Sequence, residues 1–365
     1  MIRELMKQKK QNRVQLLVKA PVRICDIGGW SDTWFSAHGK VFNITVWSKI
    51  FGSMEDKYSG ITTFADIKVA RSKKGVFKLD APDIKRKYTF STDHNDWDKS
   101  DLLQAALSAV GLPEGLDAKL AISSNVIPRG SSVGSSAAVS VGLVAMLEKI
   151  KRSEIDPNWI ARKTHEIETE IMRIQCGVQD QASIATASGA TIIDIYHYPN
   201  FKVFPCALTE STVKNLENRF LTLIYGAEHS SSEVHKLVIK RLEKKGRLAS
   251  ELENMRLLPE EARYCALDGD TEGLGRVMVR NTEGQKRLHP ALISKTCQQL
   301  IDLAKKERAY GWKVNGAGGS QGGSLTILCG QKSKSEVGLI FQKKFPKMVI
   351  LEHKIANNGL QIEIK

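Results

Sequence analysis

The chain has 365 residues, of which 42% are hydrophobic and 26% are charged, and its net charge is +14. This composition excludes a fibrous or disordered protein, and no apolar run is long enough to cross a bilayer. The length exceeds what one hydrophobic core usually serves, so we expect two domains.

The cysteines, histidines and lysines exclude three further classes of protein. The six cysteines contain no C-x-x-C pair and the eight histidines no H-x-x-x-H pair, which disfavours a zinc site or a disulfide framework. The lysines are spread through predicted helices with acidic neighbours, as at residues 241–247, and no nucleic-acid-binding motif is present. We therefore expect a cytoplasmic protein with reduced thiols and no nucleic-acid or membrane partner, whose charge attracts small anionic ligands.

The N-terminal residues 1–13 are basic and lack the apolar core and cleavage site of a secretory signal. We expect them to form a loosely ordered leader. A strand-like run follows at residues 14–20.

The segment APVRICDIGGWSDT, at residues 20–33, gathers several polar and glycine residues in a short space. Gly28 and Gly29 allow the backbone to come close to a ligand. Asp32 can accept hydrogen bonds from sugar hydroxyls, and Trp30 offers an apolar face for a sugar ring. The alternative is a Gly-Gly turn closed by an Asx-type aspartate.

The pattern between this segment and the middle of the chain is mixed. Residues 41–47 and 51–54 are strand-like, and residues 101–110 are predicted to form a short helix. Residues 59–97 are polar and irregular, with short β-like runs at residues 75–79 and 87–90.

A loop rich in serine and glycine, IPRGSSVGSSAA at residues 127–138, joins a strand-like run at 118–126 to an apolar helix at 135–150. Such a loop can turn several backbone N–H groups towards one point, and the positive end of the helix adds to the attraction for phosphate. A serine-rich cap on a buried helix is one alternative. A serine hydrolase is another, because G-x-S-x-G fits with Ser132 as nucleophile. Pro128 interrupts the strand that such a nucleophile needs, and the loop has no Walker A lysine.

The next helix begins at Asp156 and Pro157, an N-cap followed by proline at the first helical position. Its apolar stripe consists of Ile160, Thr164, Ile167, Ile171 and Ile174. Glu168 lies beside the stripe, so it faces either the edge of the core or solvent. The neighbouring Glu166 and Glu170 leave the register open.

The segment CGVQDQ, at residues 176–181, follows that helix. A carboxylate in a glycine-flanked turn after a core helix is a candidate general base, so Asp180 is either a base or a turn residue. Residues 182–195 read as a small-residue stretch and a strand that closes the first domain.

The second half of the chain begins near Phe204 and reads as a separate domain. A glycine-rich segment, VNGAGGSQGGS at residues 314–324, lies between two strand-like runs. That position favours a loop pressed against a ligand over a flexible linker. The remaining predicted elements are strands at 220–225, 312–314 and 324–329, a polar turn at 226–232, helices at 232–258, 260–267, 273–283 and 290–310, and an alternating α/β pattern at 335–343 and 347–355.

The three glycine-containing segments, at residues 20–33, 127–138 and 314–324, resemble in order the three motifs of the GHMP kinases, the family of galactokinase, homoserine kinase, mevalonate kinase and phosphomevalonate kinase. The form GGWSDT resembles the L-fucokinase and heptose-phosphate kinase branch. The form G-x-x-D-Q at residues 177–181 resembles galactokinases and heptose kinases.

The resemblance implies an α+β fold of two domains. Residues 1–203 would form an N-terminal ATP-binding domain of the ribosomal-protein-S5 type, and residues 204–365 a ferredoxin-like C-terminal domain. ATP and the acceptor would bind in the cleft between them.

The resemblance also implies Mg²⁺-dependent transfer of the ATP γ-phosphoryl group to a sugar or sugar-phosphate hydroxyl, with the anomeric hydroxyl as first choice. Asp180 would orient and deprotonate that hydroxyl, Arg23 would stabilise the Asp180 anion, and Ser136 (or Ser135) with Glu168 would hold Mg²⁺. The residues expected to bind ATP are Pro128, Gly130, Ser131, Ser132, Val133, Gly134 and Ser135, and those expected to bind the sugar are Gly29, Trp30, Asp32, Gly316 and Gly318.

Three alternative functions stay open. The first is an isoprenoid or amino-acid-alcohol kinase of the same family, which the GGWSDT and G-x-x-D-Q forms disfavour. The second is the serine hydrolase, and the third is a non-catalytic nucleotide-binding protein of the same fold, which the presence of a candidate for every catalytic role disfavours. The assembly considered is a homodimer.

Overall fold

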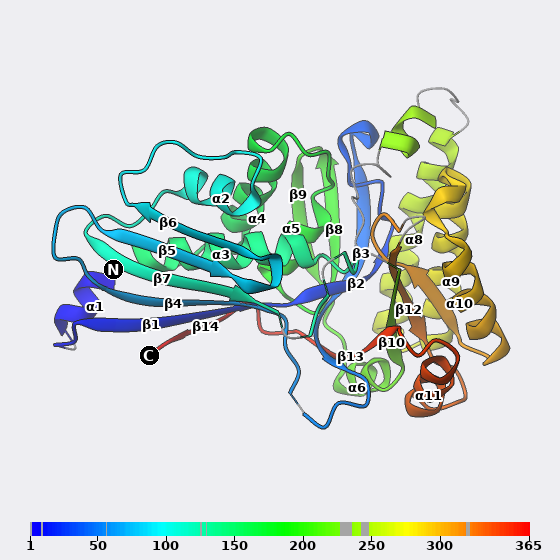
Figure 1. Ribbon diagram of the computed structural model, residues 1–365. Coiled ribbons are helices and arrows are strands. Elements are labelled where there is room, and N and C mark those ends of the chain that lie inside the picture. The colour runs from blue at the N-terminus through cyan, green and yellow to red at the C-terminus, as the bar shows by residue number, and fades with distance from the viewer. Residues whose placement is uncertain are drawn as a thin grey trace.

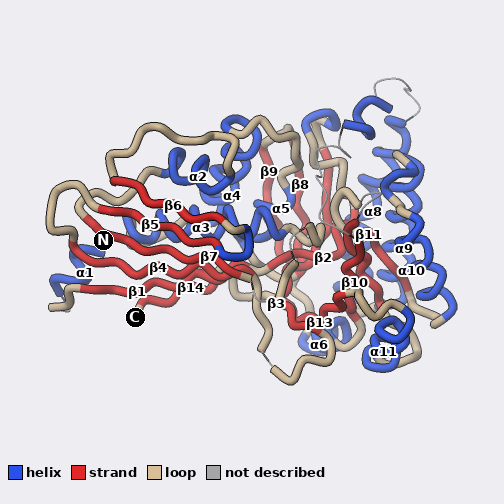
Figure 2. Tube along the Cα trace, in the orientation of Figure 1, coloured by secondary structure: helices blue, strands red, loops and turns tan. Residues whose placement is uncertain are grey.

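Two β-sheets and the helices around them make up the computed structural model of the protein, which describes residues 2–8, 10–55, 57–124, 126–128, 130–226, 236–241, 248–318 and 322–365. Figure 1 shows the first sheet on the left of the view, where both termini lie, and a group of long helices at the opposite end. Figure 2 shows that the strands run continuously from one region into the other. The α+β fold predicted from the three motifs is confirmed.

The first sheet has, among the described residues, six strands in the order β14-β1-β4-β7-β5-β6. Neighbours are antiparallel except β5 and β7, which are parallel. Alternate residues of β1 and β4 are buried, because one face of the sheet packs against α3 (Ser135–Lys151). The strands are β1 (Arg13–Ala20), β4 (Ile61–Val69), β5 (Val76–Ala81), β6 (Arg86–Ser91), β7 (Leu116–Ser123) and β14 (Gln361–Ile364).

The second sheet has eight strands in the described part of the chain, in the order β11-β12-β10-β13-β3-β8-β9, and β2 pairs with β3 beside this path. Its neighbours are antiparallel throughout. The strands are β2 (Val22–Ile27), β3 (Gly39–Ile50), β8 (Ala190–His197), β9 (Asn200–Pro205), β10 (Phe220–Gly226), β11 (Gly311–Val314), β12 (Gly322–Leu328) and β13 (Val349–Ile355).

The remaining helices lie around these sheets. Near the first sheet are α1 (Ile2–Gln8), α2 (Leu102–Val110), α4 (Pro157–Glu166), the π-helical turn η3 (Ile167–Ile171) and α5 (Gln179–Thr186). Around the second sheet are α6 (Glu210–Glu217), α8 (Leu248–Asp268), α9 (Thr271–Leu288), α10 (Lys295–Lys306) and α11 (Lys334–Lys344), and short 3-10 turns are η1 (Trp34–Ser36), η2 (Pro82–Ile84) and η4 (Pro290–Leu292). Each sheet therefore buries a face under helices, as an α+β core requires.

Four local predictions are wrong. Residues 2–8 are not a loose leader but the helix α1, whose Ile2 and Met6 are buried in the core. Residues 51–54 form a turn after β3. The stretch 59–97 is less irregular than predicted: besides the β-like runs at 75–79 and 87–90, which form parts of β5 and β6, it contains β4, in which Ile61, Thr63, Ala65 and Ile67 make up the buried face. Asp180 lies in the first turn of the helix α5 rather than in a glycine-flanked turn between elements.

The helical region of the second half also differs from prediction. A break was expected at Pro259, but α8 continues through it, since Met255, Leu258 and Ala262 are all buried in cores on both sides of the proline. The predicted helix at 290–310 is divided into η4 and α10. The polar turn predicted at 226–232, like the start of the helix predicted at 232–258, lies largely outside the described residues.

The division into two domains at residues 203 and 204 stays a prediction. That boundary falls inside β9, and β3 pairs with β8 from one side of it and with β13 from the other. The C-terminal β14 returns to pair with β1 in the first sheet. Within the described residues, no helix is both long enough and apolar enough to span a membrane.

Candidate active site

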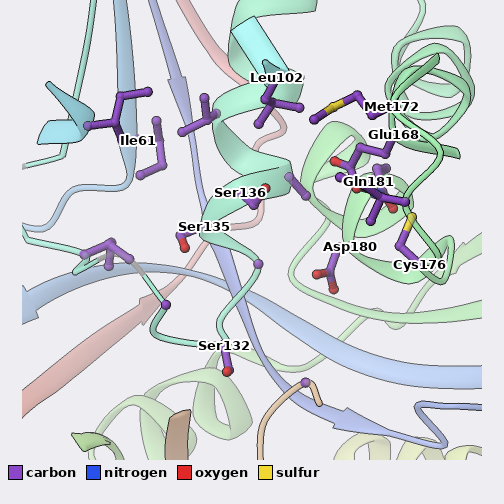
Figure 3. A pocket seen from close by; sticks show the side chains of 18 of the residues that line it. Ile61, Leu102, Ser132, Ser135, Ser136, Glu168, Met172, Cys176, Asp180 and Gln181 are labelled. Atoms are coloured by element: carbon purple, nitrogen blue, oxygen red, sulfur yellow. The ribbon is translucent and has the colours of Figure 1, made fainter. Parts of the chain in front are cut away.

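A cavity of about 920 Å³ opens where the three glycine-containing segments meet. Of the residues predicted from the sequence, those that line it are Arg23, Trp30, Asp32, Gly130, Ser132, Gly134, Ser135, Ser136, Glu168, Asp180 and Gly316. Figure 3 shows Ser135 and Ser136 on the first turn of α3, with Asp180 and Glu168 on the neighbouring helical segments. Residues far apart in the sequence therefore share one concave site.

The serine-rich loop has an unusual backbone. Gly130, Ser132 and Gly134 all have positive φ angles, of 69°, 56° and 77°. Gly134 stands at the N-cap of α3, where a Cβ atom would lie 3.0 Å from Ile184 Cδ1. A residue with a Cβ atom would displace Ile184 and would strain the backbone at this positive φ angle. Glycine therefore lets the loop turn sharply into the start of α3.

The start of α3 has unused hydrogen-bonding capacity. No side chain caps its N-terminus, and the Ser131 hydroxyl is buried with no partner among the described residues. Backbone N–H groups at the first turn of a helix also lack intrahelical acceptors. These features suit an anion, and above all a phosphate, at this end of the cavity.

Asp180 and Arg23 form an ion pair beside the loop. Arg23 Nε donates to Asp180 Oδ1 at 2.7 Å, and Arg23 Nη1 donates to the Ser132 carbonyl oxygen at 2.7 Å. Arg23 is almost fully buried, which lowers its pKa, but the charges of Asp180, Asp26 and Asp32 raise that pKa on balance. The guanidinium therefore stays charged and holds the Asp180 carboxylate, which is 28% exposed, at the cavity.

Asp32 is held at the cavity by the segment that leads into α5. Its Oδ2 accepts from Gln179 N at 3.2 Å, and its carbonyl oxygen accepts from Val178 N at 3.3 Å. A Cβ atom on Gly177 would lie only 1.9 Å from Asp32 Oδ2, so this position has room for glycine alone. Burial raises the pKa of Asp32 to about 6.

Glu168 faces inward, which settles the register that the sequence left open between three glutamates. It is buried on the π-helical turn, whereas Glu166 and Glu170 are exposed. Gln181 Nε2 donates to Glu168 Oε2 at 2.9 Å, but Oε1 has no hydrogen-bond partner among the described residues. Burial raises the pKa of Glu168 to about 7.

A magnesium ion fits this donor set. The partnerless Glu168 oxygen, together with the hydroxyls of Ser135 and Ser136 at the same cavity, offers the hard oxygen ligands that Mg²⁺ prefers. The described residues contain no group of three or more His, Cys, Asp or Glu side chains able to hold a metal. The arrangement therefore suits an ion that completes its coordination with water and phosphate oxygens rather than an all-protein site.

Five predicted residues do not line the cavity. Pro128, Ser131 and Val133 belong to the serine-rich loop but do not line the cavity, and Ser131 is fully buried. A Cβ on Gly29 would contact Asp26 Oδ2 and Gln179 Nε2, and one on Gly318 would clash with the Leu292 carbonyl oxygen. The contacts of these two glycines are thus with protein, and their role in binding a sugar stays a prediction.

Trp30 has a larger structural part than the sequence indicated. It lines the cavity but is only 4% exposed, and its ring packs among Leu252, Met255 and Leu288 of α8 and α9. Its φ angle is 78°. The long helices α8 and α9 therefore hold Trp30, and with it the segment at residues 20–33, in place.

The sequence reasoning missed Asp26, Gln181 and Lys313. Lys313 Nζ lies 3.1 Å from Asp26 Oδ1, and both side chains are buried. A lysine or aspartate inside an otherwise apolar strand is the signal that would have marked them, because such a charge needs a buried partner. The residues that would face a nucleotide base were also not predicted. Apolar side chains that line the cavity include Ile61, Ile84, Leu102, Ile122, Val139 and Met172.

Comparison with known proteins supports one family. A family model described as the GHMP kinases N terminal domain matches residues 100–189. The chain is 25% identical to a bifunctional fucokinase/GDP-fucose pyrophosphorylase of Arabidopsis thaliana over 87% of this chain and 30% of that protein. It is 24% identical to a D-glycero-alpha-D-manno-heptose 7-phosphate kinase of Campylobacter jejuni over 53% of this chain and 56% of that protein. The chain thus spans less than two thirds of the length of these two relatives.

Two further comparisons cover more of the partner protein. A mevalonate kinase of Pyrococcus furiosus is 26% identical over 83% of this chain and 90% of that protein. The crystal structure of a D-glycero-D-manno-heptose 1-phosphate kinase from Bacteriodes thetaiotaomicron superposes with a TM-score of 0.70 at 17% identity, covering 96% of this chain and 98% of that one. At this identity the structural match establishes the fold alone.

Proposed function

This chain belongs to the GHMP kinase superfamily, a family of ATP-dependent phosphotransferases, and from that premise we propose that it transfers the γ-phosphoryl group of ATP to a hydroxyl of a sugar. One observation carries the proposal. Asp180, paired with Arg23, faces the same cavity as the free N-terminus of α3. A phosphate donor and a hydroxyl acceptor can therefore meet within one site.

The phosphates of ATP would lie at the serine-rich loop. Backbone N–H groups from Gly130 to Ser135 would donate to phosphate oxygens. The dipole of the 17-residue helix α3 adds to that attraction. Ser136 (or Ser135) and Glu168 would hold Mg²⁺, which neutralises phosphate charge when bound.

Asp180 would act on the acceptor. As the acceptor oxygen bonds to the γ-phosphorus and the bond to the bridging oxygen of ADP breaks, the hydroxyl proton passes to Asp180. Arg23 holds the Asp180 carboxylate through the ion pair, and its positive charge offsets the charge of the transferred group. Asp32 would accept hydrogen bonds from other sugar hydroxyls, and Trp30, which lines the same cavity, would contact the sugar ring.

The charge of the acceptor end favours an uncharged sugar. The described residues around Asp180 bring two carboxylates, on Asp32 and Asp180, against the one guanidinium of Arg23, which Asp180 and Ser132 already occupy. The third carboxylate, on Asp26, is buried and engaged by Lys313 and Gly316. A phosphate or carboxylate on the acceptor would be repelled there. Neutral hydroxyls, by contrast, can donate to carboxylates.

Mevalonate is the second candidate acceptor. It is favoured by the mevalonate kinases that resemble this chain over most of their length. The mevalonate carboxylate would have to approach the same carboxylate-rich end, which argues against it.

The serine hydrolase alternative is weakened by the surroundings of Ser132. No histidine occurs among the described residues that line the cavity, so Ser132 has no imidazole base there. The strand β7 also ends at Ser123, well before the serine.

The experiment that tests the proposed function measures ATP consumption with Mg²⁺ against free sugars, sugar phosphates and mevalonate in parallel. Turnover on a free sugar, exceeding that on its phosphate and on mevalonate, is the expected result. Preference for a sugar phosphate or for mevalonate would keep the phosphotransferase and reject the uncharged acceptor. Fluorophosphonate labelling of Ser132, together with silence across the panel, would instead revive the hydrolase.

A further inference from the structure

A buried ion pair lies directly behind the site. Lys313 in β11 is completely buried, Asp26 in β2 is 1% exposed, and Lys313 Nζ lies 3.1 Å from Asp26 Oδ1. Lys313 does not line the cavity, so it does not touch ATP or the acceptor. Three residues near Lys313 nevertheless line the cavity: Asp26, Arg23 and Gly316.

Both oxygens of the Asp26 carboxylate are engaged. Oδ2 accepts from Gly316 N at 2.9 Å, which ties the third glycine segment to the first. Oδ1 accepts from Lys313 Nζ, and the same oxygen lies 4.0 Å from Arg23 Nη1. Lys313 and Arg23 therefore both lie within 4.0 Å of one carboxylate oxygen.

Arg23 has a choice of two carboxylates. Its Nε lies 2.7 Å from Asp180, while its Nη1 lies 4.0 Å from Asp26. A buried carboxylate without a partner is strongly unfavourable. Among the described residues, the cation paired with Asp26 besides Lys313 is the Arg23 guanidinium. Without Lys313, that contact would draw Arg23 away from Asp180.

We propose that Lys313 is a positioning residue for phosphoryl transfer: by holding the charge of Asp26, it leaves Arg23 free to pair with Asp180. The inference rests on the proposed function, in which Asp180 acts on the acceptor hydroxyl. The ammonium is itself fully satisfied, since Gln285 Oε1 at 3.0 Å and the Val314 carbonyl oxygen are its other acceptors. If Lys313 acts only by neutralising Asp26, it is needed to position Arg23 only when residue 26 carries a negative charge.

The test compares Lys313→Met with the double variant Lys313→Met/Asp26→Asn. The single variant leaves the Asp26 carboxylate without Lys313, so kcat should fall by roughly tenfold to hundredfold while KM for ATP stays within about threefold. In the double variant the amide oxygen still accepts from Gly316 N but carries no charge to compete for Arg23. It should recover most of the lost kcat.

Thr282→Val is the matched control. Thr282 Oγ1 accepts from Val314 N at 3.3 Å and donates to the Trp312 carbonyl oxygen at 3.2 Å, so its loss loosens β11 without changing a charge. We expect its kcat to stay within about threefold of wild type. A fall equal to that of Lys313→Met, or a double variant no better than the single one, would overturn the proposal.

Two provisions keep the test decisive. If Lys313→Met does not fold, the double variant, which buries no unpaired charge, carries the test: near-wild-type kcat supports the proposal and a low kcat overturns it. If the wild type turns over no acceptor, the proposed function fails, and crystal structures of the two variants decide the positioning role. Arg23 within about 3 Å of Asp26 in the single variant and back on Asp180 in the double one is the expected geometry. An Arg23–Asp180 pair unchanged in both would overturn it.

Discussion

At the scale of single residues, the ionised Asp32 side chain lowers the stability of the fold while it serves the proposed binding of the acceptor. Burial raises its pKa to about 6, so the folded protein keeps a proton that the unfolded chain releases near pH 4. The free energy of unfolding therefore falls as the pH rises from about 4 through about 6. Above that range the wild type carries a buried carboxylate whose ionisation works against the fold.

We predict that Asp32→Asn stabilises the protein at pH 7.5 by up to about 3 kcal/mol, which corresponds to roughly two pKa units. The gain should disappear at pH 4, where the wild-type carboxyl is largely protonated in both states. The same variant should raise the acceptor KM at least tenfold, because a hydrogen-bond acceptor for the sugar is lost. Urea unfolding at the two pH values and steady-state kinetics check both effects. Equal stability at pH 7.5 would show that Asp32 carries no such penalty.

Glu168 is the residue on which the magnesium proposal depends most. Its Oε1 has no partner among the described residues, whereas Gln181 engages the other oxygen. Glu168→Gln should raise the Mg²⁺ concentration needed for half-maximal rate by about tenfold or more, since a neutral amide is a weaker ligand.

The exposed neighbours provide matched controls for that variant. Glu166→Gln and Glu170→Gln change the same charge on the same helical segment without facing the cavity. Both should leave the Mg²⁺ dependence within about twofold of wild type. A magnesium requirement that shifts equally in all three variants would remove the metal-binding role from Glu168.

At the scale of elements, the segment between η3 and α5 fixes the acceptor end. Gly177→Ala would push a methyl group into Asp32, because the added Cβ would lie 1.9 Å from Oδ2. We predict a destabilisation of about 1–3 kcal/mol and a loss of acceptor turnover of at least tenfold. Thermal unfolding and acceptor kinetics measure the two effects separately.

Gly52→Ala is the control for Gly177→Ala, because it tests a glycine substitution away from the acceptor site. Gly52 has a φ of 73°, but an added Cβ meets nothing within 4 Å. This variant should lose about 1 kcal/mol of stability and keep its turnover. If Gly177→Ala keeps its turnover as well, the close fit between this segment and Asp32 has no part in acceptor binding.

The elements that the sequence predicted best are those whose signals are local. The serine-rich loop, the helix after it and the glycine loop between β11 and β12 could be predicted from turn residues and apolar runs. β4 was missed because Thr63 lies on its buried face and Phe64 on the other, so the sequence does not alternate cleanly between apolar and polar residues. The continuous α8 was missed because a proline usually ends a helix, and only packing on both sides of Pro259 overrides that tendency.

Contacts between distant residues could not be predicted in the same way. The sequence indicates that Arg23 and Asp180 belong to one site only through resemblance to a family. Lys313 and Asp26 are 287 residues apart, and neither strand alone reveals that the other charge faces it. The partnerless oxygen of Glu168 likewise depends on where Gln181 points, which is a property of the folded site.

At the scale of the whole molecule, the two halves of the chain share both sheets. β3 pairs with β8 on one side and β13 on the other, and β14 closes the first sheet against β1. We predict that the protein unfolds in a single cooperative transition and that a fragment of residues 1–203 shows none, since it leaves the edges of β1 and β3 unpaired. Calorimetry of both chains checks this. Two resolved transitions in the full chain would show that the halves are independent.

The measurement that tests the central claim most directly is a single-turnover assay, with enzyme in excess over ATP, on the acceptor that the panel identifies. Wild type is compared with Asp180→Asn, which keeps the shape of the side chain and removes the charge. We predict that phosphorylated acceptor forms at a rate lower by at least about a hundredfold in the variant, while ATP binding is unchanged. Equal rates in the two proteins would contradict the assignment of Asp180 as the group that orients and deprotonates the acceptor.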